Sequence, residues 1–229
     1  MNIITPALIK KKEQFNSIYM NLHQSIRAHG VHVGVVAGVM ARHCKEQLSE
    51  QYDLLENSLE ITIIRGGDYH DIGKHFISYA LCQKTGPLSK MEEKAVRQHP
   101  DYTGNLLLEY AEVLFDTEGA KNIALDMGRY HHEHYDGSGY PMRLKGDKIP
   151  FIAQLCAVAN TLDKATMNSR RYVDFKIAAE KIFADEGIRF SPEAVECFKQ
   201  SMDEIKTLYT AKNSWIVAGA KGVRRGKTK

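Results

Sequence analysis

Apolar residues recur at helical spacing through most of this chain. In residues 31–43 they fall at three- and four-residue steps, and residues 151–165 and 192–209 repeat the pattern. Ser191 followed by Pro192 is typical of a helix start, because the serine hydroxyl can cap the first turn and proline fits its first position. Alternating strand-like runs are scarce. The pattern predicts an all-α domain of about eight helices.

The chain has 229 residues, of which 43% are hydrophobic, enough to bury a core in one large domain or two small ones. We expect one domain over residues 25–210, a weakly attached helical extension at 1–24 and a basic tail at 211–229. The last ten residues carry five Lys/Arg and no acid, so the net charge of +3 falls to −2 without them. We interpret the tail as a solvated end, with contact to an anionic partner as the alternative.

The remaining composition excludes several classes of protein. A near-neutral body argues against binding to a nucleic acid polymer. The four cysteines stand far apart with no CxxC pair, which argues against a zinc ribbon or a disulfide scaffold and fits a reduced, cytoplasmic protein. No stretch approaches the roughly 20 apolar residues of a membrane span. We therefore expect no membrane partner.

The segment GGDYHDIGKHF contains the first candidate site. His70 and Asp71 combine imidazole and carboxylate, which suit Fe, Mn and Zn better than Mg or Ca. Adjacent helical residues point about 100° apart, so either one metal lies between the two side chains or Asp71 bridges two metals. Lys74, one turn after His70, could hold an anionic substrate such as a phosphate. Taken alone, a surface histidine beside a helix-start aspartate is the plainer interpretation.

Further candidate ligands are spread along the chain. They are His29, His32, His99, His131, His132, Asn160 and Asp163. Pro100 disfavours helical geometry at the residue before it, so His99 is predicted to end a helix. So many histidine-bearing or acidic sites at helix edges indicate ligands converging from several helices. The HHEH run contains no HExxH, so zincin spacing is absent.

The chain resembles the HD-GYP domain, a subgroup of the HD superfamily of metal-dependent phosphohydrolases. The matching segments, in the order of the family, are HDIGK at 70–74, KTGPLSKMEEKAVRQHPDYTG at 84–104, HHEHYDGSGYP at 131–141, LKGDKIP at 144–150 and ANTLDKAT at 159–166. The resemblance as a whole covers roughly residues 25 to 200. The resemblance implies a helical bundle with a metal centre between its helices. It also implies a phosphodiesterase that hydrolyses cyclic di-GMP, with linear pGpG as the expected product.

Residue by residue, the resemblance implies a set of metal ligands. They are His29, His70, Asp71, His99, His131, His132 and Asn160. His29 is favoured over His32 because small or apolar residues follow it at the positions where the family has them. Asn160 stands where the family has aspartate, and its neutral amide is a weaker ligand. Ser25 stands where three-metal members carry glutamate. We therefore expect two divalent metals per chain, Fe or Mn, with Zn, Ni or Co as alternatives.

The resemblance also implies roles in substrate binding. Lys74 would act in catalysis with His70 and Asp71 and would bind substrate. Gly139, Tyr140 and Pro141 of the GYP loop would border the substrate groove, and this loop would contact partners such as diguanylate cyclases. A demanding turn without ligand contact is the alternative for the loop. Arg170 and Arg171 resemble the RPY segment of the family, although the spacing is one residue longer and the proline is missing.

Two other functions remain open from the sequence. Asn160 and the missing glutamate favour a degenerate domain that binds metal or cyclic di-GMP as an adaptor or receptor without turnover. A phosphodiesterase for a related cyclic dinucleotide, such as 3′3′-cyclic GMP-AMP, is a third alternative, because the residues that would contact the bases are not identifiable from the sequence. No sensory domain precedes residue 25, so we expect regulatory input to come from partner proteins or from metal availability.

Overall fold

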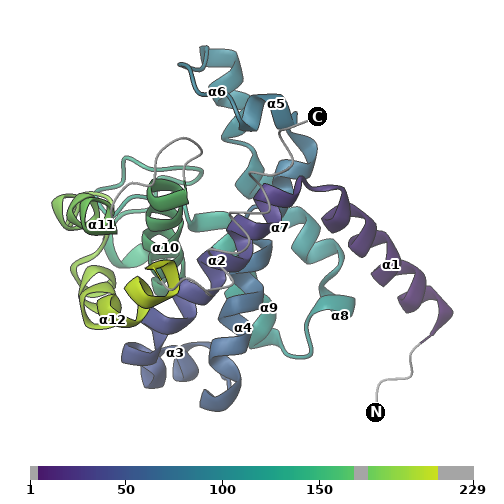
Figure 1. Cartoon of the computed structure of the whole chain (residues 1–229). Coiled ribbons are helices and arrows are strands. Elements are labelled where there is room, and N and C mark those ends of the chain that lie inside the picture. Colours follow the sequence, from purple (N-terminus) through teal and green to yellow (C-terminus); the bar gives the residue numbers. More distant parts are fainter. Residues whose placement is uncertain (1–4, 168–174, 211–229) are drawn as a thin grey trace.

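The computed structural model describes residues 5–167 and 175–210, which form a bundle of helices (Figure 1). The α-helices are α1 (Pro6–Asn21), α2 (Gln24–Ala41), α3 (Lys45–Tyr52), α4 (Glu56–Tyr69), α5 (Tyr79–Cys82), α6 (Lys90–Val96), α7 (His99–Glu109), α8 (Ala111–Leu114), α9 (Glu118–Tyr130), α10 (Phe151–Met167), α11 (Phe175–Ala184) and α12 (Pro192–Thr210). Short 3-10 helices cover Arg42–Cys44 (η1), Ile72–Phe76 (η2) and Gly146–Lys148 (η3). No β-strand occurs in these two ranges, so the predicted all-α class is confirmed.

The helices of the described ranges outnumber the expected eight because several are very short. Helices α5 and α8 have four residues each and α6 has seven. A segment of one or two turns contains too few apolar positions to show a helical period. Sequence periodicity therefore detects the long core helices and overlooks these connecting turns.

Helix α2 runs through the middle of the bundle (Figure 1). It packs against α4 and α10, and α4 also packs against α9. The apolar positions expected to face the core are buried, namely Val33, Val36, Ala37, Met40 and Ala41 in α2 and Ile152, Leu155, Val158, Ala159 and Leu162 in α10. Helices α2 and α4 touch through their backbones, since a Cβ on Gly67 would lie 2.2 Å from Cα of Gly34. This close contact fixes the spacing of the side chains that the two helices carry.

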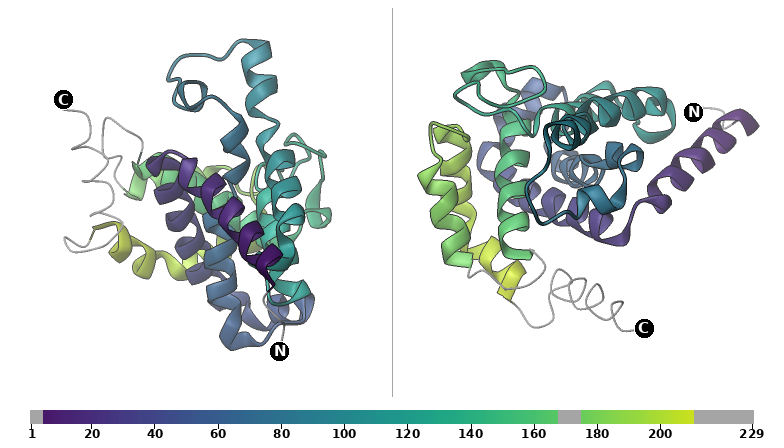
Figure 2. Two further views of the ribbon diagram at one scale, coloured as in Figure 1. Left: turned by 90° about the vertical axis from the view of Figure 1, so that its right-hand side faces the viewer. Right: turned by 90° about the horizontal axis from the view of Figure 1, so that it is seen from above.

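Helix α1 lies along the outside of the bundle (Figure 2). Its anchor is Phe15, which is 1% exposed and whose ring centroid lies 5.2 Å from that of Tyr69 and 5.5 Å from that of Tyr110. The Tyr19 hydroxyl donates a hydrogen bond of 2.7 Å to Asp68. The chain turns between Asn21 and Gln24, close to residue 24, where the sequence predicts the end of the extension.

Helix α12 begins as the sequence predicts. The Ser191 hydroxyl accepts a hydrogen bond of 3.1 Å from the Ala194 amide, and Pro192 is the first helical residue. The helix packs against α2, α10 and α11. The four cysteines are free. Among the described helices, none has both the length and the apolar character that crossing a membrane requires. The basic tail at 211–229 lies outside the described residues, as do Arg170 and Arg171.

Candidate metal centre

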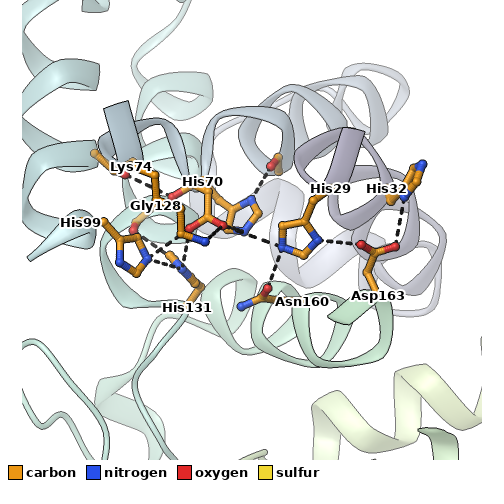
Figure 3. Close-up of polar contacts among 12 residues, drawn as sticks. His29, His32, His70, Lys74, His99, Gly128, His131, Asn160 and Asp163 are labelled. Atoms are coloured by element: carbon orange, nitrogen blue, oxygen red, sulfur yellow. Dashed lines mark hydrogen bonds and ion pairs between the residues drawn. The ribbon is translucent and has the colours of Figure 1, made fainter. Parts of the chain in front are cut away.

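Six helical elements bring the candidate ligands to one place inside the bundle (Figure 3). His29 comes from α2, His70 and Asp71 from the junction of α4 and η2, His99 from the first residue of α7, His131 and His132 from the end of α9, and Asn160 from α10. His99 therefore begins a helix instead of ending one. Proline is tolerated in a first turn because its missing N–H would have no helical partner there, so Pro100 fits directly after His99.

The Asp71 carboxylate stands between two groups of imidazoles. Its Oδ1 lies 3.1 Å from Nε2 of His99 and 3.7 Å from Nε2 of His131. Its Oδ2 lies 3.4 Å from Nε2 of His70 and 3.8 Å from Nε2 of His29. Within each of two sets, His29–His70–Asp71 and His99–His131–His132, the donor atoms lie within 4.8 Å of one another. Asp71 therefore presents one carboxylate oxygen to each of the two donor sets.

Backbone carbonyls fix the tautomers of three of these histidines. The Nδ1 atoms of His70 and His99 lie 2.6 Å and 2.7 Å from the carbonyl oxygens of Gly67 and Val96. Nδ1 of His131 lies 2.9 Å from the carbonyl oxygen of Met127. A carbonyl can only accept, so each Nδ1 carries the hydrogen and each Nε2 directs a lone pair toward Asp71. This is the second-shell pattern that orients metal-binding imidazoles.

Burial keeps these histidines neutral. Desolvation lowers the pKa of His99 and of His131 to about 4 and also lowers the pKa of His70. Burial would raise the pKa of Asp71, but the nearby charge of Lys74 holds it well below its usual value. At neutral pH the centre therefore presents an ionised carboxylate and neutral imidazoles. These are the protonation states in which aspartate and histidine bind metals.

The donor atoms fit a divalent cation in spacing and in chemistry. Nε2 of His70 and Oδ1 of Asp71 are buried without a hydrogen-bond partner, which is costly unless something else satisfies them. Neighbouring ligand atoms lie about 3.0 Å apart around an octahedral cation with bonds of about 2.1 Å, and about 3.4 Å apart around a tetrahedral one. The distances around Asp71, 3.1–3.8 Å, are close to these values. An imidazole-rich set favours transition metals over Mg or Ca.

His29 and His32, the two alternatives for the first ligand, contact different oxygens of the Asp163 carboxylate. His29 directs Nε2 to Oδ1 of Asn160 at 2.9 Å and Nδ1 to Oδ2 of Asp163 at 2.6 Å. His32 places its Nδ1 3.0 Å from Oδ1 of Asp163 and belongs to neither donor set (Figure 3). Burial would raise the pKa of Asp163, but hydrogen bonds from the two imidazoles hold it well below its usual range. Asp163 thus contacts the centre through His29 and not directly.

Neutral groups surround Ser25, which stands where three-metal members of the family carry a glutamate. The Ser25 hydroxyl lies 2.8 Å from Nδ1 of His23 and 3.5 Å from the Tyr79 hydroxyl. The His23 and Tyr79 rings stack, with centroids 3.9 Å apart. These three side chains supply no carboxylate beside the centre.

Two lysines lie beside the centre, and sequence reasoning found only one. Lys74 binds Oδ2 of Asp71 at 2.5 Å. Because η2 has three residues per turn, Lys74 aligns with Asp71 and not with His70. Lys164 follows Asn160 by one helical turn, and its charge acts on Asp71, His131 and His132. Surrounding protein and repulsion from Lys74 lower the pKa of its ammonium to about 8, although the side chain reaches solvent. The spacing of Asn160 and Lys164 in ANTLDKAT is the signal that could have revealed it.

The GYP loop closes one wall of the centre. Tyr140 stacks on His132 with ring centroids 4.7 Å apart, and the Arg97 guanidinium lies 4.8 Å from the Tyr140 centroid. Gly139 admits no side chain, because a Cβ would lie 2.3 Å from the backbone nitrogen of His134. The buried Glu133 carboxylate accepts hydrogen bonds from the amides of Met142 at 2.6 Å and Leu144 at 2.9 Å. Glu133 therefore holds the loop backbone.

A family model described as "HD domain" matches residues 40–183, more than half of the chain. This chain belongs to the HD domain family. The matched residues, 40–183 of this chain, include every candidate ligand except His29. Its HHEHYDGSGYP segment is that of the HD-GYP subgroup, and two of its relatives, described next, are named as cyclic di-GMP phosphodiesterases.

The HD domain is similar to several curated bacterial proteins. It is 29% identical to the "3'3'-cGAMP-specific phosphodiesterase 2" of Vibrio cholerae over 86% of this chain and 37% of that protein. It is 36% identical to a "Probable cyclic di-GMP phosphodiesterase" of the same organism over 64% of this chain and 34% of that protein. It is 32% identical to the "Cyclic di-GMP phosphodiesterase response regulator RpfG" of Xanthomonas campestris over 72% of this chain and 43% of that protein. The chain thus spans less than half the length of each of these relatives.

Solved structures share the fold of this HD domain. An HDG"Y"P protein from Bdellovibrio bacteriovorus, Bd1817, aligns with a TM-score of 0.57 and 19% identity over 80% of this chain and 54% of that one. The cyclic GMP-AMP phosphodiesterase V-cGAP3 from V. cholerae aligns with a TM-score of 0.50 and 18% identity over 81% of this chain and 46% of that one. At these identities the likeness establishes the helical fold.

Proposed function

We propose that this chain is a cytoplasmic, metal-dependent phosphodiesterase that hydrolyses a cyclic dinucleotide, with cyclic di-GMP opened to linear pGpG. The observation that carries the proposal is the position of Asp71 between two sets of imidazole lone pairs, with a lysine at its side. The names of the relatives, which are phosphodiesterases for cyclic di-GMP or 3′3′-cyclic GMP-AMP, support the same class of substrate.

Two divalent cations, Fe or Mn, would be held by the seven ligands His29, His70, Asp71, His99, His131, His132 and Asn160. When bound, such cations act as Lewis acids on a phosphodiester and generate a nucleophile from water near neutral pH. A third cation is not expected, because Ser25 and its neighbours supply no carboxylate. No third cation would then hold the terminal phosphate of pGpG for a second cut, so pGpG should accumulate while GMP forms slowly.

The lysines would hold the substrate. Lys74 and Lys164 place two ammonium groups beside the centre, where phosphodiester oxygens accept charge-assisted hydrogen bonds. Tyr140 faces His132 with one side of its ring and would border the bound dinucleotide with Gly139 and Pro141. By this proposal Asp71 and His70 orient the reacting centre, and Lys74 offsets the charge that develops on the phosphoryl oxygens.

The GYP loop also offers a surface to protein partners. Tyr140 and Pro141 line a groove of about 470 Å³ together with Lys90, Glu93, Lys94, Arg97 and Gln98. Met142, the next residue, is 65% exposed. A diguanylate cyclase or another signalling protein that docks here would contact the loop that carries Tyr140 against His132.

The test is a product assay. Protein loaded anaerobically with Mn²⁺ or Fe²⁺ is incubated with cyclic di-GMP and, in parallel, with 3′3′-cyclic GMP-AMP, and products are resolved by chromatography over time. We expect a linear dinucleotide to accumulate, and Asp71→Asn to abolish its formation.

Two outcomes would redirect the proposal. Tight binding of cyclic di-GMP with no product from either substrate would establish the adaptor function, which the neutral Asn160 favours. Turnover of the hybrid dinucleotide alone would assign the substrate preference of the relative that matches 86% of this chain.

A further inference from the structure

Asp163 lies behind the metal centre, and its buried carboxylate contacts three hydrogen-bond donors. The residue is 2% exposed. Its Oδ2 lies 2.6 Å from Nδ1 of His29, and its Oδ1 lies 3.0 Å from Nδ1 of His32. The Tyr209 hydroxyl, from the last turn of α12, donates to the same Oδ1 at 3.0 Å. Three donors from two helices therefore hold one buried carboxylate, an arrangement that strongly favours its ionised form.

This arrangement sets the orientation of the His29 imidazole. An ionised carboxylate can only accept, so Nδ1 of His29 carries a hydrogen and Nε2 points toward the centre. Nε2 lies 2.9 Å from Oδ1 of Asn160 and 3.8 Å from Oδ2 of Asp71. A carboxylate behind a ligating imidazole fixes its orientation and raises its basicity. The hydrogen bond to Asp163 therefore makes Nε2 of His29 a stronger electron donor to a cation. This offsets the neutral amide of Asn160, which carries no negative charge.

Tyr209 links α12 to the hydrogen-bonded pair of Asp163 and His29. Its side chain is 4% exposed, and its hydroxyl donates to Oδ1 of Asp163, the oxygen that does not contact His29. Without that hydroxyl, Oδ1 of Asp163 would retain His32 as its donor, and the carboxylate could turn away from His29. The position of α12 is therefore coupled to the orientation of a candidate metal ligand that lies 180 residues earlier in the chain.

We propose that Asp163, held by Tyr209, is a positioning residue that fixes His29 for metal binding and offsets the charge missing at Asn160. The inference rests on the metal centre of the proposed function and is independent of the identity of the substrate. It assigns to α12, the last helix described, a direct influence on metal affinity.

The test measures Mn²⁺ binding by titration, with free Mn²⁺ followed by electron paramagnetic resonance. Tyr209→Phe retains the ring and removes only the donor, and we expect the affinity of one Mn²⁺ to fall about three- to tenfold. Asp163→Asn should weaken the same Mn²⁺ about 10- to 100-fold, the usual effect of losing a second-shell partner. The affinity of the second Mn²⁺ should change little.

Tyr52→Phe is the matched control. Tyr52 is 6% exposed and its hydroxyl donates to the Asp126 carboxylate at 2.7 Å, so the variant loses an equivalent hydrogen bond between α3 and α9. It should lose comparable stability against urea with Mn²⁺ affinity unchanged. Circular dichroism verifies the fold of each variant.

The outcomes separate this inference from the proposed function. If the unsubstituted chain binds two Mn²⁺ and both Tyr209→Phe and Asp163→Asn bind them equally well, the positioning role is wrong and the phosphodiesterase proposal stands. If Tyr52→Phe loses as much affinity as Tyr209→Phe, the effect is general destabilisation and the positioning role is again wrong. If the unsubstituted chain binds no Mn²⁺ or Fe²⁺, both proposals fail.

Discussion

At the scale of single residues, the two lysines beside the centre differ in what their ammonium groups contact. Lys74 is paired with Asp71, whereas Lys164 makes no ion pair with any described residue. An unpaired cation in a partly desolvated position gains more from a phosphate than one that already has a carboxylate partner. Lys164 is therefore the lysine whose charge is most readily available to the substrate.

Lys164→Ala should raise KM for the cyclic dinucleotide about tenfold, since one charge-assisted hydrogen bond contributes about 1.5 kcal/mol or more. Metal content and kcat should change little, because Lys164 does not contact the donor atoms directly. Lys74→Ala should retain metal and lower kcat/KM. Steady-state kinetics with elemental analysis measures both. Lys199→Ala, which removes a surface lysine paired with Glu186, is the control. Unchanged kinetics in Lys164→Ala would remove that residue from the site.

Asn160→Asp should strengthen binding of one Mn²⁺ about tenfold or more. The amide oxygen lies 2.9 Å from Nε2 of His29, and a full negative charge at that place attracts a divalent cation strongly even at an effective dielectric of about 20. Turnover should rise as well if the second cation limits it. Asn57→Asp adds the same charge at the exposed start of α4 and should alter neither property. Equal metal affinity in the two variants would show that residue 160 is not a ligand.

At the scale of helices, the crossing of α2 and α4 sets the width of the centre. Gly34 and Gly67 allow the two backbones to touch, and His29 and His70 lie a short distance along the same helices with ring centroids 5.2 Å apart. Any side chain at the crossing would push the helices apart. The glycines therefore determine ligand spacing, and the Gly67 carbonyl also holds the His70 imidazole directly.

Gly67→Ala should lower the free energy of unfolding by about 1–3 kcal/mol, the usual cost of overpacking. Its Cβ would lie 2.2 Å from a backbone atom of Gly34, so α2 must move, and Mn²⁺ affinity should fall with stability. Urea denaturation and Mn²⁺ titration measure the two effects. Gly86→Ala is the control, because its Cβ would meet nothing within 4 Å. Normal Mn²⁺ affinity in Gly67→Ala would mean that the helix crossing does not control the centre.

At the scale of the whole molecule, the candidate ligands extend from residue 29 to residue 160 and come from helices that otherwise meet through apolar contacts. Cations held by these ligands would join the helices and would bind the folded chain in preference to the unfolded one. Such a ligand raises stability by mass action. The large apolar core should keep the helices folded without it.

Removal of metal by a chelator should lower Tm by about 5–10 °C. A ligand at 100 times its Kd contributes about 2.7 kcal/mol, and 1 kcal/mol corresponds to about 2–4 °C for a chain of this size. Helical circular dichroism at 25 °C should remain. Differential scanning calorimetry with and without chelator measures the shift, and Asp71→Ala should show none. Equal shifts in both proteins would place the stabilising cation elsewhere.

The sequence by itself determined the helical class, the long core helices and the chemical kinds of ligand. These features depend on local spacing, as in the buried apolar stripes of α2 and α10 and the capping of α12 by Ser191. The sequence favoured His29 over His32, and the structure places His29 beside Asp71. Only the tertiary structure decided that Pro100 follows the start of a helix and that Asp163 and Tyr209 support the centre from behind. Hydrogen-bond partners, tautomers and distances across helices depend on how distant segments pack, and periodicity along one segment carries no information about that packing.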